Sequence, residues 1–167
     1  KLNPRHAVAF NNLGTSFYKL GRYRDAKDCF VQAIRIKPDY PDACNNLGSM
    51  LLLKGQYFDA ETFLRRALKL NPRFVDARIN LGLTLSFLSG LRDAKSHFEK
   101  ALKYEPRNAD ALFGMALIAQ MEGNFDQADS MLNRALQVHP RMPRALASQA
   151  GLRKMTSSDS AWLDSAE

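Results

Sequence analysis

Prolines recur at a constant interval along this chain of 167 residues. They are separated by 34 residues each time, without insertion or deletion, at Pro4, Pro38, Pro72, Pro106 and Pro140. A fixed period of about 20 to 50 residues is typical of chains that stack copies of one small structural unit. Counted from the third residue after each proline, the units are 7–40, 41–74, 75–108 and 109–142. We therefore expect four similar units in a row.

Small and large residues alternate in fixed columns of these units. The eighth position holds only small residues, namely Gly14, Gly48, Gly82 and Ala116. Alanine fills the twentieth and twenty-seventh positions of every unit, and the seventh position is large and apolar, with Leu13, Leu47, Leu81 and Met115. Within a unit the apolar residues follow the helical spacing i, i+3 and i+4, as Phe30, Ala33 and Ile34 do. The columns therefore predict amphipathic helices that approach one another closely.

Glycine divides each unit into two helices. Gly21, Gly55 and Gly123 occupy the fifteenth position, where a left-handed backbone ends a helix. Gly90 follows one position late, which predicts a slightly altered turn in the third unit. The recurrent proline then ends the second helix of each unit. Two helices per unit predict an all-α fold built from antiparallel helix hairpins.

The columns resemble the tetratricopeptide repeat (TPR) family. In the first unit the resemblance is carried by Leu13-Gly14, Phe17, Gly21, Tyr23, Ala26, Phe30, Ala33 and Pro38. It covers 7–142 and implies a right-handed α-solenoid of four repeats, in which the first helix of each unit lines a concave groove. The fourth unit departs most, with Met115-Ala116 in place of Leu-Gly.

The two ends of the chain continue this pattern in part. Residues 1–6 resemble the end of a preceding repeat, and with no initiator Met or signal-peptide pattern the chain resembles an internal fragment. Residues 143–155 are expected to form a capping helix whose polar Ser148 and Gln149 face water. Residues 156–167 are a polar tail in which a short helix is expected around Trp162.

Asparagines recur on the first helices, at positions that the resemblance places in the groove. The sixth position holds Asn12, Asn46 and Asn80, the fifth adds Asn11 and Asn45, and Gly114 breaks the series. A side-chain amide both donates and accepts, so a row of amides is able to bond the backbone of an extended peptide whatever its sequence. This row resembles the asparagine ladder of the O-linked N-acetylglucosamine transferase superhelix. The alternative is that these amides bond neighbouring helices or water.

Apolar residues share the predicted groove with the asparagines. The candidate binding residues among them are Leu52, Leu83, Phe87, Phe113, Leu117 and Met121. An apolar strip with polar anchors suits an amphipathic peptide, although part of this strip alternatively packs inside the stack. Asp42, Asp76 and Asp110 stand in the first turns, where carboxylates interact well with the helix dipole, and they favour a neutral or basic peptide over an acidic one.

A second mode of TPR recognition is not expected here. The resemblance to chaperone-binding TPR domains implies a cationic clamp for a terminal carboxylate. The corresponding positions carry Asn11, Thr15, Asn46, Asp76 and Asn80, and only one of the five matches. The basic charges that hold a carboxylate are missing from these positions.

Other function classes find little support in the sequence. The net charge of +7 lies mostly on second helices and turns, so we expect no nucleic-acid partner. We expect no catalysis, cofactor or metal, since the three histidines occupy unrelated positions and only Cys29 and Cys44 are present. No apolar run is long enough to cross a membrane, and the few cysteines favour a reducing compartment, which makes the cytoplasm the expected location.

Three functional interpretations remain open. The first is a free-standing scaffold that holds a partner protein or peptide in the groove. The second is the TPR arm of a larger enzyme, because residues 145–156 and the polar turn after them resemble the junction of bacterial TPR-sulfotransferase proteins. The third is self-association through the terminal repeats, since an open stack exposes apolar end faces.

Overall fold

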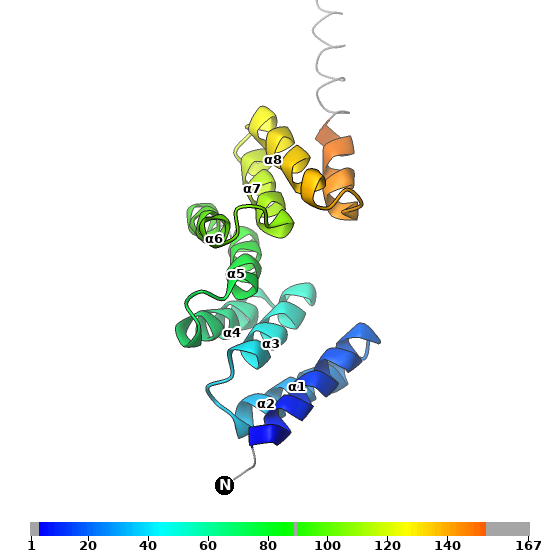
Figure 1. Cartoon of the computed structure of the whole chain (residues 1–167), viewed down its shortest axis with the longest axis vertical. Helices are drawn as coiled ribbons and strands as arrows, with labels where there is room; N and C mark the ends of the chain where they lie inside the picture. Colours follow the sequence, from blue (N-terminus) through cyan, green and yellow to red (C-terminus); the bar gives the residue numbers. More distant parts are fainter. Residues whose placement is uncertain (1–3, 89, 153–167) are drawn as a thin grey trace, which may run out of the picture. The chain divides into compact units, whose positions relative to one another are not determined.

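The computed structural model of the chain describes residues 4–88 and 90–152, and every regular element in these residues is a helix (Figure 1). The helices are α1 (Pro4–Lys19), α2 (Tyr23–Ile36), α3 (Pro41–Leu53), α4 (Tyr57–Leu70), α5 (Val75–Phe87), α6 (Leu91–Tyr104), α7 (Ala109–Met121) and α8 (Phe125–Val138). Residues 143–152 form a further helical segment after α8. The all-α helical repeat fold is confirmed.

The helices pair into hairpins within two compact bodies. The N-terminal body is Lys1–His97 and the C-terminal body is Phe98–Glu167, so that α6 spans the boundary. In the N-terminal body α1 packs on α2 and α3 on α4, while α2 also packs on α3 and α4 on α5. In the C-terminal body α7 and α8 form the corresponding hairpin (Figure 1). Helices α3 and α5 are thus each held by the second helix of the unit before.

The hairpin turns share one closing hydrogen bond. Gly21, Gly55 and Gly123 have positive φ angles of 74°, 72° and 76°, as expected for residues that end a helix. In each of these turns the N–H of the sixteenth position donates to the carbonyl of the eleventh, at 2.9 Å for Gln56 to Leu51. Gly90 makes the same bond to Leu85 at 2.9 Å. The third turn therefore keeps this closure although its glycine comes one position late.

Close approach of the paired helices explains the small columns. A Cβ atom added to Gly14 would lie 2.7 Å from the Phe30 ring, and one on Gly48 would lie 2.6 Å from Leu64. The alanines of the twentieth and twenty-seventh positions have no exposed surface, as for Ala26 and Ala33. The eighth position is therefore small because it faces a large side chain at van der Waals distance.

The first helix departs from the expected pattern. The seventh position is buried in the later units, where Leu47, Leu81 and Met115 have 1%, 1% and 8% of their surface exposed. Leu13 is 45% exposed, because within the described residues no helix covers that side of α1. Helix α1 also begins at Pro4, three residues before the expected start of the first unit at residue 7.

The helical segment 143–152 uses its polar residues for packing. Gln149 is 8% exposed, and its Nε2 donates to Asp129 Oδ1 at 3.0 Å and to Asn133 Oδ1 at 2.7 Å. Ser148 exchanges hydrogen bonds with the Gln120 side chain. The prediction that Ser148 and Gln149 face water is therefore wrong, because both bond to helices of the preceding unit. The predicted end of this helix at residue 155 and the tail 156–167 lie outside the described residues.

Candidate functional site

The asparagines of the N-terminal body are joined in pairs across neighbouring units. Asn46 Nδ2 donates to Asn11 Oδ1 at 3.0 Å, and Asn80 Nδ2 donates to Asn45 Oδ1 at 3.0 Å. In each pair the sixth position of one unit bonds the fifth position of the unit before. The same register in both pairs shows that the first helices are aligned alike at both junctions.

Burial divides the asparagines into two kinds. Asn11 and Asn45 are buried, with 6% and 7% of their surface exposed, whereas Asn46 and Asn80 are partly exposed and Asn12 is exposed. Each partly exposed amide donates one N–H to the buried asparagine of the preceding unit. Its oxygen and second N–H are left for other partners. Asn46 and Asn80 are therefore able to meet a ligand, and the buried pair orients them.

The apolar candidates of the N-terminal body lie on the same helices as Asn46 and Asn80 and differ in exposure. Leu52 and Leu83 are partly buried, whereas Phe87 is 60% exposed. The Phe87 ring stacks on Tyr57 of the preceding unit, with ring centroids 4.7 Å apart and planes inclined by 10°. The stack fixes the orientation of an exposed aromatic face at the end of α5.

In the C-terminal body the apolar candidates separate further. Phe113 is only 7% exposed and belongs to the core of this body, with the Arg144 guanidinium 5.0 Å from its ring centroid. Its expected place in an open groove is therefore not what the structure shows, because the helical segment 143–152 brings Arg144 over the ring. Leu117 is partly buried and packs against the same core, and Met121 is 56% exposed.

Gly114, which breaks the asparagine series, lies against a ring. A Cβ atom on Gly114 would lie 2.3 Å from Cε1 of Phe98. An asparagine at this position would therefore collide with Phe98. A side chain at the sixth position of the fourth unit would thus require Phe98 to shift.

Acidic residues stand in the first turns of α3 and α5. Asp42 and Asp76 are exposed at these positions. The pKa of the nearby Tyr40 phenol is raised by burial and by the charge of Asp42, and a side-chain hydrogen bond with Asn11 opposes the rise. Asp42 therefore places a negative charge near Tyr40, at the start of α3.

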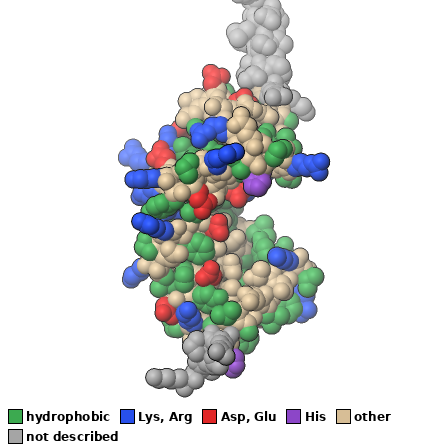
Figure 2. Space-filling view, viewed as in Figure 1, with side chains coloured by type: hydrophobic (Ala, Val, Ile, Leu, Met, Phe, Trp, Pro, Cys, Tyr) green, Lys and Arg blue, Asp and Glu red, His purple; other side chains and the backbone are tan. Residues whose placement is uncertain are grey.

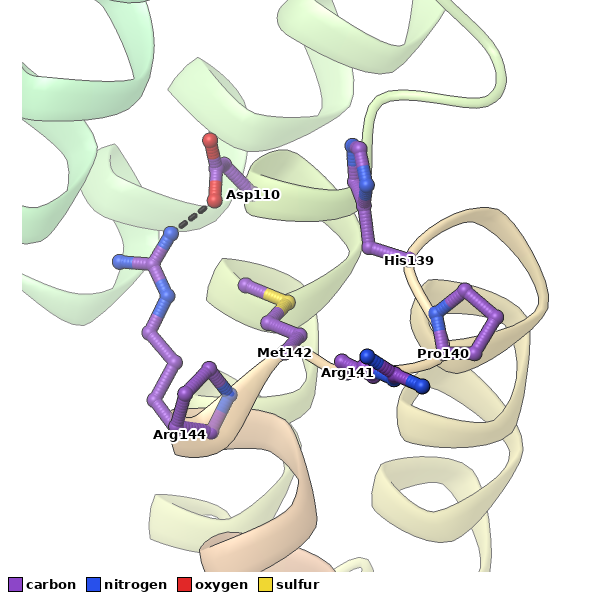
Figure 3. A pocket seen from close by; sticks show the side chains of 7 residues that line it. Asp110, His139, Pro140, Arg141, Met142 and Arg144 are labelled. Carbon is purple, nitrogen blue, oxygen red and sulfur yellow. Dashed lines mark hydrogen bonds and ion pairs between the residues drawn. The ribbon is translucent and has the colours of Figure 1, made fainter.

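A hollow lies elsewhere, at the connector after α8 (Figure 3). Its volume is about 820 Å³, and its lining includes His139, Arg141, Met142 and Arg144. Arg144 forms an ion pair with Asp110, shown by the dashed line in Figure 3, and burial lowers the pKa of its guanidinium. Because Arg144 is already held by Asp110 and Phe113, this hollow is a joint between the last hairpin and segment 143–152 rather than a prepared anion site.

Charged and potentially metal-ligating side chains also occur within the described residues. Basic and acidic side chains both lie on the face drawn in Figure 2. In residues 4–88 and 90–152 no group of three or more His, Cys, Asp or Glu side chains is placed to hold a metal ion. None of the described helices is both long and apolar enough to cross a membrane.

Family models identify the repeats directly. Models described as tetratricopeptide repeat match residues 7–40, 41–74 and 91–152. The chain belongs to the tetratricopeptide repeat family. The TPR resemblance is thereby confirmed, and the first two matches coincide with the boundaries that the prolines predicted. A comparison with curated protein sequences finds no significant match.

Solved TPR structures resemble this one. YrrB, a TPR protein with an unusual peptide-binding site, is 28% identical over 86% of this chain and 74% of its own, with a TM-score of 0.71. The first TPR of Spaghetti (RPAP3), bound to the HSP90 peptide SRMEEVD, is 25% identical over 73% of this chain and 97% of its own, with a TM-score of 0.70. TTC0263, a TPR protein of Thermus thermophilus, shares the fold, at 24% identity, 90% and 82% coverage and a TM-score of 0.82.

Some features of the site escaped sequence reasoning. The pairing of Asn11 with Asn46 had a signal, since two adjacent asparagines recur in the first and second units at the same positions. The stack of Tyr57 on Phe87 had none, because it joins the seventeenth position of one unit to the thirteenth of the next only through the three-dimensional register. The contact of Arg144 with Phe113 likewise depends on how segment 143–152 packs.

Proposed function

We propose that this chain is a protein-interaction scaffold that holds an extended peptide of a partner along the first helices of its N-terminal body. The main support for this proposal is the pair of hydrogen bonds from Asn46 to Asn11 and from Asn80 to Asn45. These bonds hold two partly exposed amides in one orientation, one per unit, with an acceptor and a donor remaining on each. Such amides suit a peptide backbone, which offers an N–H and a carbonyl at nearly every residue.

The neighbouring side chains support an amphipathic ligand. Leu52 and Leu83 are partly exposed, and the stacked ring of Phe87 presents a rigid apolar face. An ordered aromatic ring binds at a lower entropic cost than a mobile side chain, so Phe87 is suited to anchor one apolar ligand residue. In the C-terminal body Leu117 and Met121 offer partly buried and exposed apolar surface for the same kind of contact.

The charge of the surface favours neutral or basic peptides. Asp42 and Asp76 are exposed at the first turns of α3 and α5. Carboxylates in the first turns of these helices repel an acidic peptide that binds along them and attract a basic one. YrrB and the RPAP3 repeat, whose structures are described with a peptide-binding site and a bound peptide, support the peptide-binding role in general.

Fluorescein-labelled decapeptide pools test this function. Three pools share the same apolar and hydroxyl residues and carry net charges of −2, 0 and +2. Fluorescence anisotropy should show binding of the neutral and +2 pools, weaker binding of the −2 pool, and a loss of about tenfold or more for the double change Asn46→Ala and Asn80→Ala.

The matched control is Asn71→Ala, at an exposed asparagine in the connector after α4. It should leave peptide affinity unchanged, and circular dichroism should show that the double variant is folded at the assay temperature. Unchanged affinity of a folded double variant, or a preference for the −2 pool, would contradict the proposed site.

A further inference from the structure

Four positions of α3 and of α5 form one open stripe on each helix. The second, sixth, ninth and thirteenth positions of a unit follow one another at intervals of four, three and four residues, so they lie on one side of the helix. On α3 the stripe is Asp42, Asn46, Ser49 and Leu53. On α5 it is Asp76, Asn80, Leu83 and Phe87. The two outer residues of each stripe are exposed and the two middle ones are partly exposed, so a ligand is able to reach all four.

The chemistry changes in the same order along both stripes. A carboxylate stands in the first turn, an amide follows one turn later, and the last residue is apolar, 57% exposed at Leu53 and 60% exposed at Phe87. The carboxylate and the apolar residue are eleven residues apart, or about 16 Å along the helix. A peptide that crosses the helices at the amides therefore has a negative flank on one side and an apolar flank on the other.

The two stripes are aligned with each other. Helix α3 packs on α5, and the asparagine bonds repeat one register at both junctions of the body. At the end of α3 the Lys54 ammonium lies 3.8 Å from the centroid of the Tyr23 ring. One unit later Phe87 stacks on Tyr57, which corresponds to Tyr23. The amides and the apolar ends of α3 and α5 therefore form two parallel rows.

The spacing of the rows favours one conformation of an extended ligand. Helices that pack on each other lie about 8–10 Å apart, so the amides are offered at about this interval. A polyproline II helix has three residues per turn and a rise of about 3.1 Å, so it presents the same face about every 9.3 Å. A β-strand presents the same face after two residues, or about 6.6 Å, and is out of register at the second amide. The rows therefore match the polyproline II period.

The backbone of such a ligand has hydrogen-bonding groups to offer. A polyproline II helix forms no internal hydrogen bonds, so its carbonyl and N–H groups are all available. Asn46 and Asn80 each keep one N–H and the side-chain oxygen after donating to a buried asparagine. The N–H is able to donate to a ligand carbonyl, and the oxygen is able to accept from any ligand residue other than proline. One proline per turn is therefore compatible with the amides.

We propose that the ligand is a polyproline II segment with a repeating pattern of three residues. One residue of each turn is proline or a small residue and faces the amides. A second is basic and points toward the flank of Asp42, and the third is apolar and points toward Leu53 and Phe87. This inference rests on the proposed function and names the class of ligand for the same site.

Charge and rigidity support both flanks of this ligand. Asp42 is exposed in the first turn of α3, and its charge is complementary to a basic side chain. The Phe87 ring is held by its stack on Tyr57. An apolar ligand residue therefore binds a surface that is already ordered, which lowers the entropic cost of the contact.

Three labelled dodecapeptides test the pattern. The first repeats Pro-Lys-Leu four times. The second keeps every proline in place but exchanges Lys and Leu in alternate triplets, so that each flank of the peptide carries both types. Fluorescence anisotropy should show that the first binds at least about tenfold more tightly than the second. The third has glycine in place of each proline and should bind more weakly than the first, because it loses more conformational entropy on binding.

Variants of the protein test the two flanks. Phe87→Ala should weaken binding of the Pro-Lys-Leu peptide by about fivefold or more. The matched control is Phe58→Ala, at an aromatic residue that is 77% exposed outside the stripes, and it should leave the affinity unchanged. Asp42→Asn should weaken binding of this peptide by about two- to fivefold, and it should have no effect on a peptide with Gln in place of Lys.

Each part of the inference has a result that would overturn it. Equal affinity of the two peptides of identical composition would contradict the pattern of three, and tighter binding of the glycine peptide would contradict the polyproline II conformation. Equal effects of Phe87→Ala and Phe58→Ala would contradict the apolar flank. If Asn46→Ala with Asn80→Ala still weakened every peptide in these cases, the proposed function would stand without this ligand class. Binding of no peptide at all would contradict both.

Discussion

The side chain of Asn46 donates a hydrogen bond of 3.0 Å to the side chain of Asn11, 35 residues earlier in the chain. The acceptor is buried and the donor is partly exposed. A buried oxygen that loses its donor keeps the cost of its desolvation, whereas an exposed donor that loses its acceptor turns to water. The bond therefore has an asymmetric effect on stability.

Substitution of this pair should reveal the asymmetry. Asn46→Ala leaves Asn11 Oδ1 buried without its donor and should lower the free energy of unfolding by about 1–3 kcal/mol. Asn12→Ala, at the same position of the first unit but exposed, should change it by less than about 0.5 kcal/mol. Urea denaturation followed by circular dichroism measures both. Equal effects of the two variants would show that the pair contributes nothing beyond an exposed asparagine.

Glycines 114 and 151 should respond in opposite directions to the same change. Gly114→Ala places a methyl group within 2.3 Å of the Phe98 ring and should destabilise the C-terminal body by about 1–3 kcal/mol despite the better helix propensity of alanine. Gly151 has no atom within 4 Å of an added Cβ, so Gly151→Ala should stabilise by about 0.5–1 kcal/mol. Thermal unfolding of the two variants decides this, and a neutral Gly114→Ala would mean that Phe98 moves aside freely.

The repeat itself was predictable because its causes are local and periodic. The proline interval, the glycine turns and the alanine columns each reflect a steric requirement at one position, and Ala26 and Ala33 are fully buried as expected. The state of Leu13 was not predictable in this way. The equivalent residues Leu47 and Leu81 are covered by a neighbouring helix. The exposure of Leu13 instead depends on which helices lie beside α1, which its residue type does not reveal.

The candidate site was only partly readable for a similar reason. The asparagine columns located Asn46 and Asn80, but nothing in the residue types separated them from the buried Asn11 and Asn45. That distinction depends on the side-chain direction at adjacent positions of one helix, about 100° apart. Phe113 shows the same limit, because its burial depends on a core to which segment 143–152 contributes, with Arg144 over its ring.

Stability should fall in alkaline solution because of two buried thiols. Burial raises the pKa of Cys44 and of Cys29 above the ordinary value of 9.0, and neighbouring Asp25 and Asp28 raise that of Cys29 further. Above pH 9 the folded chain then binds more protons than the unfolded chain, so the free energy of unfolding decreases as pH rises. Well below pH 9 the contribution of the two thiols to the free energy of unfolding is fully present.

Urea midpoints between about pH 7 and 10.5 measure the alkaline effect. They should be level from about pH 7 to 8 and decline above about pH 9, and Cys44→Ala should reduce the decline. Tyr18 and Tyr40, whose pKa values are raised from 10.0 mainly by burial, should add to it near the top of the range. A decline that Cys44→Ala leaves unchanged would assign the effect to the tyrosines alone.

Arg144 should stabilise the C-terminal body more through Phe113 than through Asp110. Both members of the Arg144–Asp110 pair are about half exposed, with side-chain exposures of 46% and 54%, and exposed ion pairs contribute about 0.2–1 kcal/mol. The guanidinium also covers the buried Phe113 ring, where it contributes a cation–π contact and shields apolar surface. Arg144→Ala should therefore cost more than Asp110→Asn, and added salt should weaken only the smaller, Asp110-dependent part. Thermal unfolding of Arg144→Ala and Asp110→Asn in low and high salt separates the two contributions. If both variants lost the same stability and high salt abolished that loss, the ion pair would account for the whole effect of Arg144.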